Sequence, residues 1–196
     1  MFDYFIIYKP YGYLSQFTKE TEDHLTLADL DFPFPSDAYP VGRLDKDSEG
    51  LLIITNDKKL NAKLLHPKNK HRRTYLVQVD NIPTKEAIDQ LSQGVDIKIN
   101  KKIHHTLPAT ATLLSNPPTL PDRDPPVRFR KNIPTAWVSL TLTEGKNRQV
   151  RRMCAKVGYP VLRLVRLRIE NLVLDPLLVG SVKRVEKTEI YRLLRI

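Results

Sequence analysis

Residues 50–57, with the sequence GLLIITND, decide most about the fold. The run Leu51–Thr55 is short, continuous and apolar, and turn-forming residues follow it, so we expect a buried strand. Asn56 or Asp57 can then cap a helix, because the leucines over residues 60–65 are spaced to share one helical face. The first third of the sequence therefore contains a strand that leads through a cap directly into a helix.

The same two periodicities extend to both sides of this stretch. The connections between the expected elements are short, and no long crossover helix separates the strands, which favours antiparallel pairing. The sequence therefore predicts a fold that mixes α and β structure. The expected strands cover residues 5–8, 75–79, 137–143 and 161–174, and the expected helices follow Thr84 (to Gly94) and cover 147–157.

The segment Asn116–Pro134 is the least regular part of the chain. It holds six of the 15 prolines, which exclude a long helix or a central strand. We interpret it as a surface loop with the basic stretch Arg128–Lys131 near its end. The length of 196 residues suits one domain, or two small lobes that share a core.

The composition restricts the classes of function. The chain carries 32 Lys+Arg against 22 Asp+Glu, a formal net charge of +10, which favours a polyanionic partner. The single Cys154 excludes an intramolecular disulfide framework, so we expect a reducing, cytoplasmic location. No run of about 18 apolar residues or signal-peptide pattern predicts contact with a membrane.

Metal and nucleotide cofactors are not expected. Among five histidines, only His104 and His105 are neighbours, and adjacent residues on a strand point in opposite directions. Neither common Gly-rich phosphate loop occurs, and the chain has only 7 glycines.

The first candidate site is the polar loop over residues 41–50, which leads into the central strand. Its carboxylates are Asp45, Asp47 and Glu49, and Arg43 lies beside them. By pattern alone, a solvated turn is the better interpretation, and paired carboxylates are also compatible with a glycosidase. A calcium loop is excluded because a lysine intrudes and the later Glu ligand is missing.

The second candidate site lies on the expected helix at residues 147–157. Residues 143–168 contain eight basic side chains and a single acidic one, Glu144. Arg148, Arg151 and Arg152 share one helical face by their spacing. Guanidinium groups bind phosphates well, so contact with a polyanion is a better interpretation than a solvated helix face.

The third candidate is Tyr75, which follows a basic stretch on an expected strand. It is either a ring that stacks on a nucleobase or an ordinary half-buried strand residue. Alone, this signal is weak.

Taken together, these segments resemble the RsuA-type ribosomal RNA pseudouridine synthases. The resemblance covers nearly the whole chain. Within this family, the chain is most similar to the short large-subunit rRNA synthases of the RluE type. One departure is Ser48, where Thr is commoner. The motifs that carry it are YKPYG (8–12), GRLDKDSEGLL (42–52) with TND (55–57), RTYLV (73–77), EGKNRQVRRM (144–153) and VGYPVLRLVR (157–166).

The resemblance implies a fold and a reaction. The fold is α+β, with a mixed, mainly antiparallel sheet in two sub-lobes, flanking helices and an active cleft between the sub-lobes. Residues 1–196 would form one catalytic domain without an S4 domain. The reaction is the isomerisation of one uridine in large-subunit (23S) rRNA to pseudouridine, by a monomer that needs no cofactor or metal. The motifs do not encode which uridine is chosen.

The resemblance also assigns roles to residues. Asp45 would be the catalytic aspartate, Arg151 its ion-pair partner, and Tyr75 the ring that stacks on uracil. Leu164, or its neighbour Leu162, would form the apolar wall beneath the base. Phosphate contacts would come from Arg43, Arg148, Arg152, Arg163 and Arg166.

Two alternatives stay open on the sequence. A non-catalytic rRNA-binding module or rRNA-folding chaperone would need the basic residues but not a buried carboxylate. A glycosidase would need a second positioned carboxylate and a sugar-stacking surface.

Overall fold

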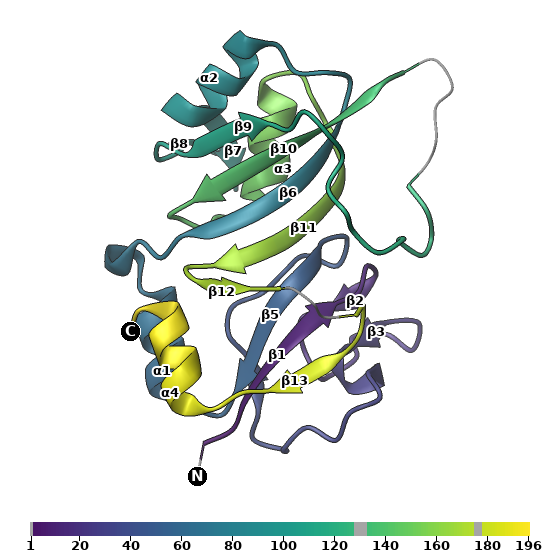
Figure 1. The fold of residues 1–196 in the computed structure, drawn as a ribbon, viewed down its shortest axis with the longest axis vertical. Helices are drawn as coiled ribbons and strands as arrows, with labels where there is room; N and C mark the ends of the chain where they lie inside the picture. Colours follow the sequence, from purple (N-terminus) through teal and green to yellow (C-terminus); the bar gives the residue numbers. More distant parts are fainter. Residues whose placement is uncertain (1, 128–132, 175–177) are drawn as a thin grey trace. The chain divides into compact units, whose positions relative to one another are not determined.

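The computed structural model describes residues 2–127, 133–174 and 178–196. The chain forms two compact units (Figure 1). The first unit contains Met1–His71 and Arg166–Ile196, and the second contains Arg72–Val165. Within the described ranges, no helix has both the length and the apolar character needed to cross a membrane.

The first unit is built on two antiparallel strands, β1 (Tyr4–Lys9) and β5 (Glu49–Thr55). Every residue of both strands is buried, which confirms the buried central strand expected from residues 51–55. β13 (Val182–Arg184) pairs with the other edge of β1, and β4 (Tyr39–Pro40) pairs with β5. The shorter elements are β2 (Tyr13–Leu14), β3 (Leu25–Thr26), η1 (Leu27–Asp29), η2 (Pro67–Asn69) and β12 (Leu172–Val173).

Asp57 links three elements of the first unit. Its Oδ1 accepts hydrogen bonds from the amides of Lys59 (2.9 Å) and Leu60 (3.3 Å), so it caps α1 (Lys58–Leu65) as the sequence predicted. Its Oδ2 accepts from the hydroxyls of Tyr4 (2.7 Å) on β1 and Tyr191 (2.6 Å) on α4 (Lys187–Leu194). Although burial disfavours the ionised form, these four donors hold the pKa of Asp57 below its usual value.

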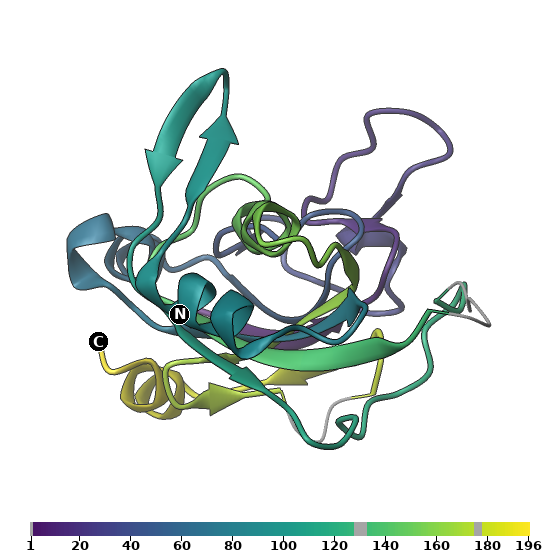
Figure 2. The ribbon, with the colours of Figure 1, turned by 90° about the horizontal axis from the view of Figure 1, so that it is seen from above.

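The second unit is a sheet covered by helices. β6 (Arg73–Asp80) pairs with β10 (Thr135–Leu142), and β10 pairs with β9 (Thr110–Leu113), all antiparallel. Figure 2 shows α2 (Lys85–Gln93) and α3 (Gln149–Lys156) on one face of this sheet. The core beneath them joins Val77, Val138 and Leu140 on the strands to Leu91 and Met153 on the helices.

One hairpin of the second unit was not expected from the sequence. Its strands are β7 (Asp96–Ile99) and β8 (Lys102–His105), which pair antiparallel and project from the unit (Figure 2), with β7 in contact with α3. The turn residues Asn100 and Lys101 both have positive φ, 47° and 66°. Two such residues form the left-handed turn that suits a two-residue hairpin.

Other expectations are refined. No helix or strand is formed by the described part of the Pro-rich segment 116–134, and its basic stretch Arg128–Lys131 lies outside the described residues. The long extended segment expected over 161–174 is two paired strands, β11 (Val161–Ile169) and β12, because the chain turns at Glu170 (φ 49°). The predicted α+β class with mainly antiparallel pairing is confirmed; β2 and β3 pair parallel.

We expect Asp57→Ala to lower the free energy of unfolding by roughly 3 kcal/mol. The cap accounts for about 1 kcal/mol, and the loss of an acceptor by two tyrosine hydroxyls for the rest. Urea unfolding measures the change. Asp23→Ala, which removes an exposed acid of the same unit, is the control and should change stability by less than about 0.5 kcal/mol. A loss below about 1 kcal/mol in Asp57→Ala would contradict the role of Asp57 as a hub.

Candidate active site

The carboxylate loop, residues 41–48 with Glu49, is fixed to the first turn of the chain. The Ser15 hydroxyl donates to the Leu44 carbonyl (2.9 Å) and accepts from the Leu44 amide (3.0 Å). The Gly12 amide donates to the Lys46 carbonyl (2.8 Å). Because Asp45 lies between these two anchors, its backbone position is well defined.

Glycines make this close arrangement possible. Gly42 has a φ of +69°, and a Cβ there would lie 3.1 Å from Leu65 Cδ2. Gly50, with a φ of +104°, pairs with Lys9 across the β1–β5 ladder. A larger residue at either position would strain the backbone at one end of the loop.

Lys9 lies fully buried next to this loop. Its Nζ donates to the carbonyls of Pro10 (2.8 Å) and Tyr13 (2.6 Å). Desolvation lowers the pKa of Lys9 to about 7, a shift that the negative charges of Glu49, Asp47 and Asp45 oppose. Two acceptors match the two N–H bonds of a neutral amine, so both protonation states keep these contacts.

Asp45 is therefore half-buried in a loop of dense, mixed charge. Glu49 is 1% exposed, and Arg166, which also acts on the pKa of Lys9, donates from Nε to the Leu51 carbonyl (2.8 Å). Charges held in such an enclosure interact more strongly than charges in water. Asp45 thus shares a partly enclosed loop with acidic and basic side chains.

The basic helix α3 begins in an unusual way. Arg148, the residue immediately before the helix, has a φ of +50° and makes no side-chain cap. Arg148 is exposed, whereas Arg152 donates to the backbone carbonyls of Asn147 (3.1 Å) and Lys98 and to the Asn147 side chain. Arg151 is half-buried and donates to the Val161 carbonyl (3.4 Å). The three arginines thus differ sharply in their surroundings.

Tyr75 and Leu164 belong to the core side of the second unit. Tyr75 pairs with Leu140 across the β6–β10 ladder and packs, half-buried, against the core. Leu164 is 4% exposed within the same core, while Leu162 is half-buried. Arg163 is also buried and donates to the Pro121 carbonyl (2.8 Å).

Metal and thiol chemistry find little support among the residues that the structure describes. No group of three His, Cys, Asp or Glu side chains there is arranged to hold a metal ion. Cys154 is buried, and desolvation raises the pKa of its thiol to about 12, which suits a packing role.

A comparison with protein families matches residues 3–156 to the model of RNA pseudouridylate synthases. The chain belongs to the RNA pseudouridylate synthase family. The match includes both the carboxylate loop and the basic helix. The resemblance found in the sequence is therefore confirmed, and the chain is an isomerase of this family.

Individual pseudouridine synthases agree with this assignment. The chain is 48% identical to "Ribosomal large subunit pseudouridine synthase E" of Vibrio parahaemolyticus, over 92% of this chain and 73% of that protein. The protein of the same name from Xanthomonas axonopodis pv. citri is 47% identical over 88% of both chains. A solved structure titled "Crystal structure of pseudouridylate synthase" superposes with a TM-score of 0.79 at 27% identity, covering 98% of this chain and 74% of that one.

The site residues predicted for this pseudouridine synthase divide between the units. Asp45, Arg43 and Arg166 belong to the first unit, and their pairing with residues of the second stays a prediction. Arg163 and Arg166 are buried against backbone carbonyls, and their predicted phosphate contacts likewise remain untested. The second unit contributes Tyr75, Arg148, Arg151, Arg152, Arg163 and Leu164.

Sequence reasoning missed Lys9, which entered only as part of the YKPYG motif. One signal was available: Lys9 directly follows the apolar run at residues 5–8. Its pairing with Gly50, which has no side chain to compete for the space, is visible only in the structure.

We expect Lys9→Met to change how stability depends on pH. The unfolded chain keeps a proton on Lys9 up to about pH 10, whereas the folded chain loses it near pH 7. Wild-type stability should therefore rise with pH between these values, by at most about 1.4 kcal/mol per pH unit. Below pH 7 the cost of burying the charged amine is present in full.

The measurement is urea unfolding at several pH values between about 6 and about 9.5, a range that begins below the pKa of folded Lys9 and ends below that of the unfolded chain. The stability of Lys9→Met relative to wild type should decline as the pH rises. Lys46→Met, at an exposed lysine of the same loop, is the matched control. A relative stability of Lys9→Met that stays flat across this interval would contradict the burial argument.

Proposed function

We propose that this chain converts one uridine of large-subunit rRNA to pseudouridine. The observation that carries the proposal is the 48% identity with "Ribosomal large subunit pseudouridine synthase E", which spans 92% of the chain. The net charge of +10 suits an RNA substrate.

The reaction itself sets what the protein must supply. The N1–C1′ bond of the uridine breaks, a C5–C1′ bond forms, the C5 proton is lost and N1 gains a proton. Atoms and electrons balance within the nucleoside, so no oxidant or energy source takes part. The protein must extrude the nucleoside from stacked RNA at a cost of a few kcal/mol, provide an ionised carboxylate and accept the C5 proton.

Asp45 is the carboxylate that we assign to this task. It attacks C1′ or removes the 2′ proton, and either route requires the ionised form. The anchoring of its loop by Ser15 and Gly12 supports this role, as does the buried Lys9 beside it. A carboxylate fixed in position before substrate binds needs little reorganisation during the reaction.

Three residues of the second unit complete the proposed chemistry. Arg151 forms an ion pair with Asp45 and keeps it charged, Tyr75 stacks on the uracil and assists removal of the C5 proton, and an apolar side chain lies beneath the base. Leu162 suits that last role better than Leu164, because it is half-buried rather than enclosed in the core.

Binding of the RNA backbone is assigned first to Arg43 and Arg148. Both are exposed, and exposed guanidinium groups can reach phosphates bidentately. Arg152, Arg163 and Arg166 remain members of the proposed set, with their guanidinium groups also bonded to protein carbonyls.

We expect Asp45→Asn and Arg151→Met each to reduce tritium release from rRNA carrying 5-tritiated uridine by roughly a thousandfold. Because the two side chains act as one ion pair, the double variant should lose little more activity than the less active of the two single variants. Asp47→Asn, two residues along in the same loop, is the matched control and should stay within about tenfold of wild type.

Two outcomes would overturn this assignment. Full activity in Asp45→Asn would show that another group, and not Asp45, carries out the chemistry. Fully multiplicative losses in the double variant would show that Asp45 and Arg151 act independently.

We expect Arg148→Ala to reduce the salt dependence of RNA binding. A phosphate contact contributes about −0.9 to the slope of log K against log salt, and Arg148→Ala should remove about that amount. Filter binding of a large-subunit rRNA transcript at several salt concentrations measures the slope. Lys85→Ala, at an exposed lysine of α2 in the same unit, is the control, and equal slopes in both variants would contradict the contact.

A further inference from the structure

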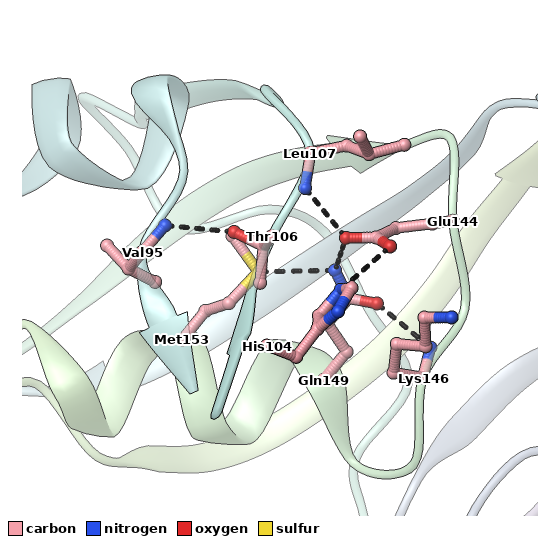
Figure 3. Close-up of polar contacts among 8 residues, drawn as sticks. All are labelled: Val95, His104, Thr106, Leu107, Glu144, Lys146, Gln149 and Met153. Atoms are coloured by element: carbon pink, nitrogen blue, oxygen red, sulfur yellow. Dashed lines mark hydrogen bonds and ion pairs between the residues drawn. The ribbon is translucent and has the colours of Figure 1, made fainter. Parts of the chain in front are cut away.

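Glu144, the one acid in the basic segment 143–168, receives three hydrogen-bonding groups from three parts of the second unit (Figure 3). Its Oε1 accepts from the Leu107 amide (2.8 Å) and from Gln149 Nε2 (2.7 Å). Its Oε2 lies 3.1 Å from His104 Nε2. The side chain is only 11% exposed, so it is part of the folded unit and not a solvated surface acid.

These contacts determine how helix α3 begins. Gln149, the first residue of α3, is buried, and its Oε1 accepts from the Lys146 amide (2.9 Å) (Figure 3). No side chain caps this helix, and Arg148 takes a left-handed conformation immediately before it. The Gln149 side chain therefore ties the turn before α3 to Glu144 from both sides, accepting from Lys146 and donating to the carboxylate.

The same carboxylate holds the base of the β7–β8 hairpin. His104 is on β8, and Leu107 follows in the connection to β9. On the same hairpin, the adjacent His105 contacts Asp96 of β7 instead (2.8 Å), and that pair is largely exposed. The hairpin thus has two histidine–carboxylate contacts. The His104–Glu144 contact is linked to the basic helix through Gln149, whereas the His105–Asp96 contact stays within the hairpin.

We propose that Glu144 is a positioning residue that sets the direction of Arg148 for binding RNA phosphate. This inference rests on the proposed function, because it needs Arg148 to contact RNA. Glu144 touches no substrate; it acts by fixing the turn that presents the arginine.

The proposal predicts a change in RNA affinity opposite in direction to that of a simple electrostatic effect. An acid within a basic surface repels RNA, so removing its charge would strengthen binding. A positioning residue gives the opposite result, because the arginine then loses its preferred direction and part of its charge-assisted contact.

The test measures the affinity of an rRNA transcript by filter binding, with every variant built on Asp45→Asn so that no turnover occurs. Glu144→Ala should weaken binding roughly tenfold, as expected for one charge-assisted contact. In the Arg148→Ala background, the same substitution should change the affinity by less than about twofold, because the residue through which it acts is gone.

Conservative variants separate positioning from a loss of folding. Glu144→Gln keeps an oxygen for Leu107 and Gln149, and His104 can face the new amide in its other tautomer; it should recover most of the affinity. His104→Ala removes one of the three contacts and should weaken binding about threefold, again only when Arg148 is present. Asp96→Ala, in the exposed pair of the same hairpin, is the matched control and should leave the affinity unchanged.

Each remaining outcome contradicts the proposal. Equal or tighter binding by Glu144→Ala overturns it, as does an undiminished loss in the Arg148→Ala background. If Arg148→Ala itself leaves the affinity unchanged, the phosphate contact in the proposed function fails and this inference fails with it. If Arg148→Ala weakens binding but Glu144→Ala does not, only the positioning role is wrong.

Discussion

The first unit depends on the antiparallel pairing of β1 with β5, two strands without an exposed residue. This pairing places Lys9 opposite Gly50, at the point where the carboxylate loop enters its strand. An amine is thereby buried among carboxylates, and its desolvation costs stability. Folded proteins accept such a cost where it organises charge, and here the organised charge surrounds Asp45.

The arginines of the chain lie in two kinds of environment. Some arginines are exposed, as Arg43 and Arg148 are, and their charge faces solvent and any polyanion within reach. Others are buried and donate to backbone carbonyls: Arg163 bonds to Pro121 and Arg166 to Leu51. A count of basic residues therefore overstates the number of phosphate contacts, because planar guanidinium groups also brace loops.

Long-range polar contacts repeat one pattern in both units. Asp57 and Glu144 are separated in sequence from most of their partners, and each collects several donors on one carboxylate. In each case the carboxylate fixes the start of a helix, α1 directly and α3 through Gln149. Such multiply bonded carboxylates hold elements in one arrangement, since losing the carboxylate removes several hydrogen bonds at once.

Local signals in the sequence determined the strands β1, β5, β6 and β10, and the helix capped by Thr84, since side-chain periodicity and capping act over a few residues. They also determined the family, through motifs that stay contiguous. The β7–β8 hairpin was missed, although Asn100-Lys101 is a weak turn signal, because each of its strands has only four residues and β8 is mostly exposed. Only the tertiary structure decided that Lys9 is buried, that Arg152 bonds to Lys98, and that Glu144 meets His104 forty residues away. Desolvation and long-range hydrogen bonds depend on which segments pack together, and no local pattern contains that information.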